Sequence, residues 1–116
     1  MRENILKNKS YDFAIRIVKL SQFLQNDRKE YVLSKPILRS GTAIGALIRE
    51  AEYGQSKLDF IHKLTISLKE ANETEYWINI LKDTGYLEQN IYESILGDCN
   101  ELLKLLMHQL RHQKKE

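Results

Sequence analysis

Apolar residues recur every three or four positions through most of this 116-residue chain, which is the period of an amphipathic helix and not of a strand. Short polar segments divide the pattern into four stretches, which predict helices over residues 10–26, 34–53, 56–84 and 90–112. Four helices with short connections pack antiparallel to their neighbours in sequence. The pattern therefore predicts an all-α fold, an antiparallel up-down-up-down four-helix bundle that residues 1–116 form as one domain.

Local signals set the expected ends of these helices. Ser10 is a suitable N-cap for the first helix, and Pro36 suits the first turn of the second, where a missing N–H costs nothing. Ser56 and Asp59 resemble a capping box in which aspartate replaces glutamate. Gly85 is expected to end the third helix, and the charged tail after residue 110 is expected to fray.

The second predicted helix differs from the others because its segment 41–48 carries no charge and consists mainly of small residues. A glycine inside a helix costs roughly 1 kcal/mol relative to alanine, so the close approach of other helices must offset this cost. A helix that is apolar all round is buried on more than one side. We therefore expect this helix to face both its own core and a neighbouring subunit. The residues assigned to the subunit interface are Gly41, Ala43, Gly45, Ala46 and Leu47.

Composition agrees with a soluble globular protein, because 42% of the residues are hydrophobic and 29% are charged. No apolar run reaches the roughly 20 residues of a membrane span, and the N-terminus lacks the apolar core of a signal peptide. We therefore expect a cytoplasmic protein with no membrane partner. The single cysteine, Cys99, excludes an internal disulfide, and its apolar surroundings in the sequence favour a buried, inert thiol over a reactive one.

Two segments, residues 38–51 and 59–77, resemble the signatures of a known bacterial family, the four helix bundle proteins. Members are also called ribosomal RNA intervening-sequence proteins, because insertions in the large-subunit ribosomal RNA gene encode some of them. The chain departs from the family pattern at Ala43 and Leu47, where the family usually has serine and asparagine. Both changes remove polar groups from the second helix.

The resemblance implies a small homo-oligomer, a ring of five bundles, with no established activity. The family is also similar to the accessory proteins of diversity-generating retroelements, which form pentameric barrels and associate with a reverse transcriptase and nucleic acid. On this basis we expect a non-enzymatic, oligomeric accessory or scaffold protein. Its candidate partners are RNA, a reverse transcriptase or a ribosome-associated protein. The alternative is a purely structural protein-interaction module with no nucleic-acid role.

One end of the predicted bundle gathers both termini, the turn between the second and third helices, and many basic residues. The net charge of the whole chain is only +2, so charge alone does not demand a nucleic-acid partner. A ring would repeat the basic end and raise its avidity for a polyanion. The other interpretation is an ordinary solvated end. The residues assigned to the candidate nucleic-acid surface are Lys7, Lys9, Lys57, Arg111, Lys114 and Lys115.

No catalytic constellation is discernible, so we predict that the protein is not an enzyme and uses no cofactor. Asp59 and His62 form the one acid-x-x-His pair, whereas a di-iron bundle needs two such pairs and two further glutamates. His108 and His112 have the spacing of one helix face, but no third metal ligand follows from the sequence. We therefore assign no metal site.

Glu75 is the one acid on the apolar stripe of the third helix, where a bare carboxylate is costly to bury. The other members of that stripe are Ile61, Leu64, Leu68, Ala71 and Ile78. In an antiparallel hairpin Glu75 comes level with Ser34, at the start of the second helix, where free N–H groups favour an anion. We interpret Glu75 as a structural buried acid that caps this helix; a ligand-binding acid and simple exposure are the alternatives. The same alignment of residues along the antiparallel second and third helices places Arg49 near Asp59 and predicts an ion pair between them.

Overall fold

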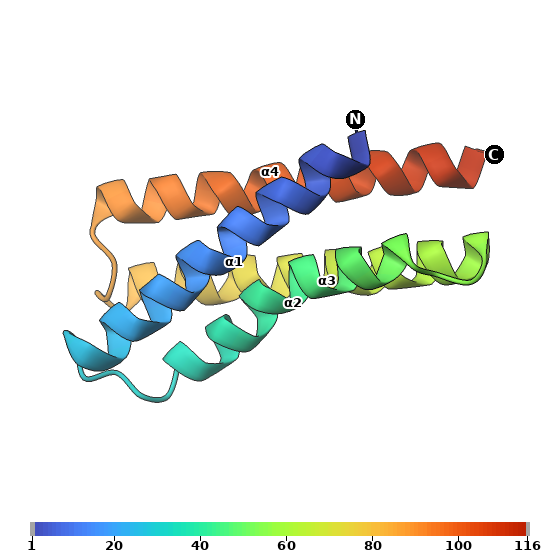
Figure 1. The fold of residues 1–116 in the computed structure, drawn as a ribbon. Coiled ribbons are helices and arrows are strands. Elements are labelled where there is room, and N and C mark those ends of the chain that lie inside the picture. The colour runs from blue at the N-terminus through green and yellow to red at the C-terminus, as the bar shows by residue number, and fades with distance from the viewer. Residues whose placement is uncertain (1, 116) are drawn as a thin grey trace.

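The computed structural model describes the backbone of residues 2–115 and the side chains of residues 5–113. This part of the chain folds into four helices: α1 (Arg2–Asn26), α2 (Ser34–Glu52), α3 (Lys57–Asp83) and α4 (Gln89–Lys115). Successive helices run antiparallel in an elongated body of 46 × 22 × 21 Å (Figure 1). The fold is all-α, as predicted. None of the described helices combines the length and apolar character that crossing a bilayer requires.

Both outer helices are longer than predicted. α1 begins at Arg2, so Ser10 is not its N-cap. Ser10 is instead buried inside the helix, where its hydroxyl donates a hydrogen bond to the carbonyl of Lys7 at 3.0 Å. At the other end of the chain, α4 continues to Lys115 and does not fray after residue 110. The predicted bounds of α2 and α3 agree with the structure to within one residue at each end.

Local chemistry sets both ends of α3. The Ser56 side chain accepts a hydrogen bond from the N–H of Asp59 at 3.0 Å, which confirms Ser56 as the N-cap. Asp59 does not complete a capping box, because its carboxylate accepts from the N–H of Gln55, at 3.4 Å. Beyond the C-cap, Gly85 has a φ of 86°, a left-handed conformation that glycine adopts without the strain of a Cβ.

The N-terminus of α2 is capped by Glu30 and not by Glu75. Glu30 is buried, and its Oε2 accepts from the N–H groups of Val32 and Leu33 at 3.1 and 3.0 Å. Its Oε1 accepts from the buried N–H of Ser34 at 2.9 Å. The carboxylate therefore satisfies amides that lack partners inside the helix and lies where the helix dipole favours a negative charge.

The buried side of α3 is rotated relative to the prediction, which explains why Glu75 is only half-buried. Small polar residues, Ser67 and Thr74, take the buried positions where the prediction had Leu68 and Glu75. The Ser67 hydroxyl donates to the carbonyl of Ile44 at 2.9 Å, and the hydroxyls of Thr74 and Ser40 lie 2.9 Å apart. These short side chains let α2 and α3 pack closely while every buried hydroxyl has a partner.

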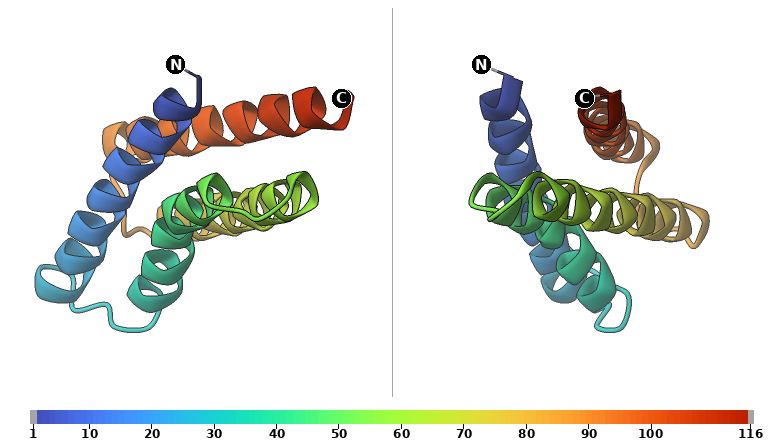
Figure 2. Two further views of the ribbon diagram at one scale, coloured as in Figure 1. Left: turned by 45° about the vertical axis from the view of Figure 1, so that its right-hand side comes forward. Right: turned by 90° about the vertical axis from the view of Figure 1, so that its right-hand side faces the viewer.

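α1 and α4 diverge toward the end that holds both termini, and they touch over much less of their length than the other neighbouring helices. Figure 2 shows the first turns of α1 and the last turns of α4 standing apart. Two ion pairs connect them further along, Arg16 with Asp98 at 2.8 Å and Lys9 with Glu101 at 3.2 Å. The bundle is therefore open at the end where the chain begins and ends.

The opposite end of the bundle is held together by Arg28. Its guanidinium donates hydrogen bonds to the carbonyls of Tyr86 and Gly85 at 3.1 and 3.2 Å. It also lies over the Tyr86 ring, 5.0 Å from the ring centroid. These contacts join the α1–α2 loop to the α3–α4 loop, so this end is closed.

Candidate functional site

The outer side of α1 and α2 carries exposed apolar side chains. Tyr11, Ile15 and Val18 have the spacing of one helix face, and their exposed fractions are 57, 42 and 38%. Beside them lies a shallow hollow of about 230 Å³, whose lining includes Tyr11, Gly45 and Ala46. We call these five residues the α1–α2 face. Three neighbouring exposed apolar side chains on one helix are a candidate contact surface for another protein chain.

The small residues of α2 have two different neighbours. Gly41 is buried against its own α1, because an added Cβ would lie 2.8 Å from the side chain of Ile17. Its small size is therefore required inside the subunit, which removes Gly41 from the predicted interface. Gly45 also lies against α1, because an added Cβ would be 3.2 Å from the hydroxyl oxygen of Ser10. Gly45 and Ala46 both line the outer hollow, and Ala46 is exposed. The remaining predicted interface residues are both half-buried: Ala43 and Leu47.

The predicted basic end is less available to phosphates than the sequence suggested. Lys7 lies 2.9 Å from a carboxylate oxygen of Glu52, and Lys9 lies 3.2 Å from one of Glu101. These ion pairs compensate two of the predicted cations. Lys57 is exposed on the first turn of α3. Two further residues of that prediction have side chains outside the described part of the chain: Lys114 and Lys115.

A row of exposed basic residues runs along α4. Lys104, His108 and Arg111 are spaced by four and three positions, so they lie on one face of the helix, and all three are exposed. Among the described side chains, no ion pair involves Lys104 or Arg111. We call these three residues the α4 row. Of these three residues, only Arg111 belongs to the nucleic-acid surface predicted from the sequence, because that prediction grouped charges by bundle end and not by helix face.

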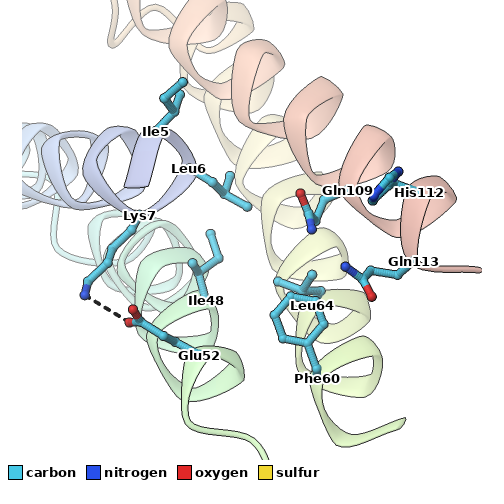
Figure 3. A pocket seen from close by; sticks show the side chains of 10 residues that line it. All are labelled: Ile5, Leu6, Lys7, Ile48, Glu52, Phe60, Leu64, Gln109, His112 and Gln113. Atoms are coloured by element: carbon cyan, nitrogen blue, oxygen red, sulfur yellow. Dashed lines mark ion pairs between the residues drawn. The ribbon is translucent and has the colours of Figure 1, made fainter. Parts of the chain in front are cut away.

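A cleft of about 840 Å³ lies at the open end of the bundle, between the diverging helices (Figure 3). Apolar side chains from α1, α2 and α3 form one part of its lining, and polar side chains from all helices except α3 form the rest. The apolar members are Ile5, Leu6, Ile48, Phe60 and Leu64, and the polar members are Lys7, Glu52, Gln109, His112 and Gln113.

Cys99 is buried, as predicted. Its side chain is fully buried, and its S–H donates to the carbonyl of Ala71 at 3.5 Å. Burial raises the pKa of Cys99 to about 12, and the negative charges of Glu75 and Asp98 add to the shift. A thiol with this pKa stays protonated at neutral pH and is a poor nucleophile. Within residues 5–113, no three His, Cys, Asp or Glu side chains come together as metal ligands.

Charged side chains across α2 and α3 form different pairs from the one predicted. Arg49 does not pair with Asp59; the neighbouring Glu50 pairs with Lys63 at 3.1 Å. Asp59 is held instead by the backbone turn before α3.

Further along the same two helices, Arg39 bridges two acids. Its guanidinium lies 2.7 Å from Glu73 and 3.3 Å from Glu70. The Trp77 ring N–H also donates to Glu73, at 3.0 Å. The hydrogen bonds from Trp77 and Arg39 lower the pKa of Glu73. This cluster has the geometry of a structural bridge between helices. Arg39 donates to one oxygen of Glu70, and the other oxygen, Oε1, is buried without a hydrogen-bond partner among the described residues.

Over the described residues, the fold defines a small all-α protein of four helices. The chain belongs to the 23S rRNA-intervening sequence protein family, whose model matches residues 2–108. This membership confirms the resemblance seen in the two sequence segments. A solved protein of unknown function from the S23 ribosomal protein family of Bacteroides thetaiotaomicron is 57% identical, with a TM-score of 0.94. The match covers 96% of this chain and 99% of that chain. The comparison with curated proteins gave no match.

Proposed function

We propose that this protein is a non-enzymatic, self-associating scaffold whose subunits join through the α1–α2 face. The supporting observation is that protruding apolar side chains, Ile15 and Val18, lie beside a hollow at Gly45 and Ala46 on the same subunit. In the proposed contact, the protruding side chains of one copy fill the hollow of the next copy. A contact between two different patches is heterologous, and it closes into a ring when the rotation between copies permits. The family resemblance implies a ring of five.

Size-exclusion chromatography with light scattering tests this proposal through two matched variants. Ile15→Glu places a charge in the middle of the α1–α2 face, and Ile91→Glu places the same charge on α4. Both isoleucines are 42% exposed, so a glutamate at either position stays hydrated in the monomer. We expect the wild type and Ile91→Glu to share one oligomeric mass, and Ile15→Glu to have the single-chain mass of 13.7 kDa. A monomeric wild type, or an Ile15→Glu variant that remains oligomeric, contradicts the proposal.

A second role, the binding of a polyanion such as structured RNA, has its own support in the α4 row. Lys104 and Arg111 are exposed and lack described acidic partners, so phosphates do not have to displace a carboxylate from them. Lys7 and Lys9 contribute less in this arrangement, because their ion pairs would have to open. Each subunit of a ring repeats the row, which multiplies a weak attraction.

Fluorescence anisotropy with a structured RNA at several salt concentrations tests this second role. The variant is Lys104→Ala/Arg111→Ala, and the control is Lys19→Ala/Lys35→Ala, which removes the same charge from exposed positions near the closed end. Each lost phosphate contact should reduce the slope of log affinity against log salt by about 1. We expect the first pair to weaken binding and flatten the slope by about 2, with little change in the control. Equal losses in the two variants refute a role for the α4 row.

A further inference from the structure

Arg49 lies at the hollow beside the α1–α2 face without an acidic partner. The charged side chains that line this hollow are Lys7 and Arg49. Lys7 is compensated by Glu52, at 2.9 Å. Arg49 is exposed, and among the side chains of residues 5–113 no ion pair or hydrogen bond involves its guanidinium. The hollow therefore presents an uncompensated positive charge beside its small apolar residues.

An acid, Asp12, lies beside the protruding side chains of α1. It is exposed and precedes Ile15 by three positions, so the Cβ atoms of the two residues are about 5–6 Å apart on the helix surface. In the described part of the chain, no ion pair or side-chain hydrogen bond involves its carboxylate. The cations one turn away on α1, Arg16 and Lys9, are already held by acids of α4 at 2.8 and 3.2 Å. Asp12 is thus available to a cation from outside the subunit.

Two rows of side chains on these helices have the same spacing. The row on α1 consists of Asp12, Ile15 and Val18, and the row on α2 consists of Arg49, Ala46 and Ala43. Each row takes every third position of its helix, so neighbouring side chains are about 5–6 Å apart in both. When Ile15 of one copy is placed on Ala46 of the next and the rows run in opposite directions, the acid of one row meets the cation of the other. The valine then meets the second alanine, so large apolar side chains lie on small ones.

The charges favour this alignment over its alternative. If the rows ran in the same direction, Arg49 would face Val18, and neither charge would have a partner. In the antiparallel alignment, the nearest other charge on this side of α1, Lys19, comes level with the uncharged Thr42, four positions before Ala46. The alignment therefore brings opposite charges together without placing Lys19 against another cation.

We propose that a second copy of this chain supplies the missing counterion, so that Asp12 of one subunit pairs with Arg49 of its neighbour. This inference rests on the proposed self-association and specifies its register. A misaligned contact would bury apolar side chains equally well but would leave both charges against uncharged surface, which is unfavourable. Complementary charges at an interface contribute more to specificity than to affinity. The ion pair therefore selects which alignment of the two helices forms.

Exchange of the two charges tests the proposal. Asp12→Arg and Arg49→Asp each place like charges opposite one another, and they change the net charge of the chain in opposite directions. The double variant restores an opposite pair in reversed order. Analytical ultracentrifugation of the full-length protein measures the concentration at which half of the assembly dissociates. We expect each single variant to raise this concentration about tenfold, and the double variant to return to within about threefold of the wild type.

Control variants make the same charge changes away from the α1–α2 face. Asp83→Arg and Lys69→Asp lie at exposed positions on α3 and should dissociate as the wild type does. Equal effects in these controls would assign the result to net charge and overturn the inference. A loss of fold caused by either single substitution would persist in the double variant, so recovery of the assembly in the double variant reports on the ion pair itself.

The remaining outcomes separate this inference from the self-association on which it rests. If the single variants dissociate as the wild type does while Ile15→Glu is monomeric, the subunits join through this face but the ion pair is refuted. If the double variant dissociates as readily as the single variants, Asp12 and Arg49 do not face each other, and the inference is wrong. A monomeric wild type refutes both the self-association and the ion pair.

Discussion

Replacing Glu30 with glutamine tests which acid caps α2. The glutamine keeps the size of the side chain but has one acceptor oxygen in place of two. In the native protein the two carboxylate oxygens serve three backbone N–H groups, those of Val32, Leu33 and Ser34. In the variant, the amide NH2 group faces at least one of these donors and cannot accept from it. Glu75→Gln is the matched comparison, because Glu75 is half-buried and caps no described helix.

The expected cost of Glu30→Gln follows from these contacts. A buried donor left without a partner costs about 1–3 kcal/mol, and the N–H of Ser34 is buried. Loss of a negative charge from a helix N-terminus costs a further ~0.3–1 kcal/mol. The N–H groups of Val32 and Leu33 are only partly buried, so water replaces some of their lost bonding. We expect a decrease of about 2 kcal/mol in the free energy of unfolding, which corresponds to about 8 °C in Tm for a chain of this size.

Urea unfolding followed by circular dichroism measures this decrease. Protein concentration must be equal in all samples, because self-association would contribute to the apparent stability. The midpoint for Glu30→Gln should fall clearly below that of the wild type, with an unchanged slope, while Glu75→Gln should stay within about 0.5 kcal/mol of the wild type. If the two variants are equally stable, or if Glu75→Gln is the less stable of the two, Glu30 is not the residue that caps the N-terminus of α2.

Two further predictions concern packing and thiol chemistry. Gly41→Ala should lower the free energy of unfolding by about 1–3 kcal/mol, because the new Cβ would lie 2.8 Å from the fully buried Ile17. Gly97→Ala should raise the free energy of unfolding by about 1 kcal/mol, because no atom lies within 4 Å of its new Cβ. Thermal melts measure both effects, and a change of the same sign in both variants would contradict this packing. Cys99 has its pKa raised from 9.0 to about 12, so its contribution to stability is present below pH 9 and lost as pH rises toward 12. Iodoacetamide at pH 8 should therefore modify Cys99 in urea but not in the native protein, and rapid native labelling would contradict its burial.

Features that depend on neighbouring residues in the chain could be predicted from the sequence. The apolar stripe of α1, which includes Phe13, Ile17 and Leu24, is buried as its spacing indicated, because a helix places every third or fourth residue on one side. Ser56 was identifiable as an N-cap because a cap contacts backbone groups only three residues away. The family was identifiable too, because its two signatures are continuous segments. These properties follow from local geometry, so the order of residues is sufficient to reveal them.

Features that depend on how helices cross one another could be decided only by the tertiary structure. α3 has 27 residues and two adjacent stripes that suit burial, and the approach of α2 selects the one with Ser67 and Thr74 over the one with Glu75. Glu30 acts from a loop, so its role depends on a chain path that periodicity does not describe. The open cleft exists because α1 and α4 diverge, and an interhelical angle arises from the packing of side chains from several helices at once. Periodicity therefore indicated where the four helices lie, although not the full length of α1 and α4, and three-dimensional packing determined which helix faces meet and which surfaces remain exposed.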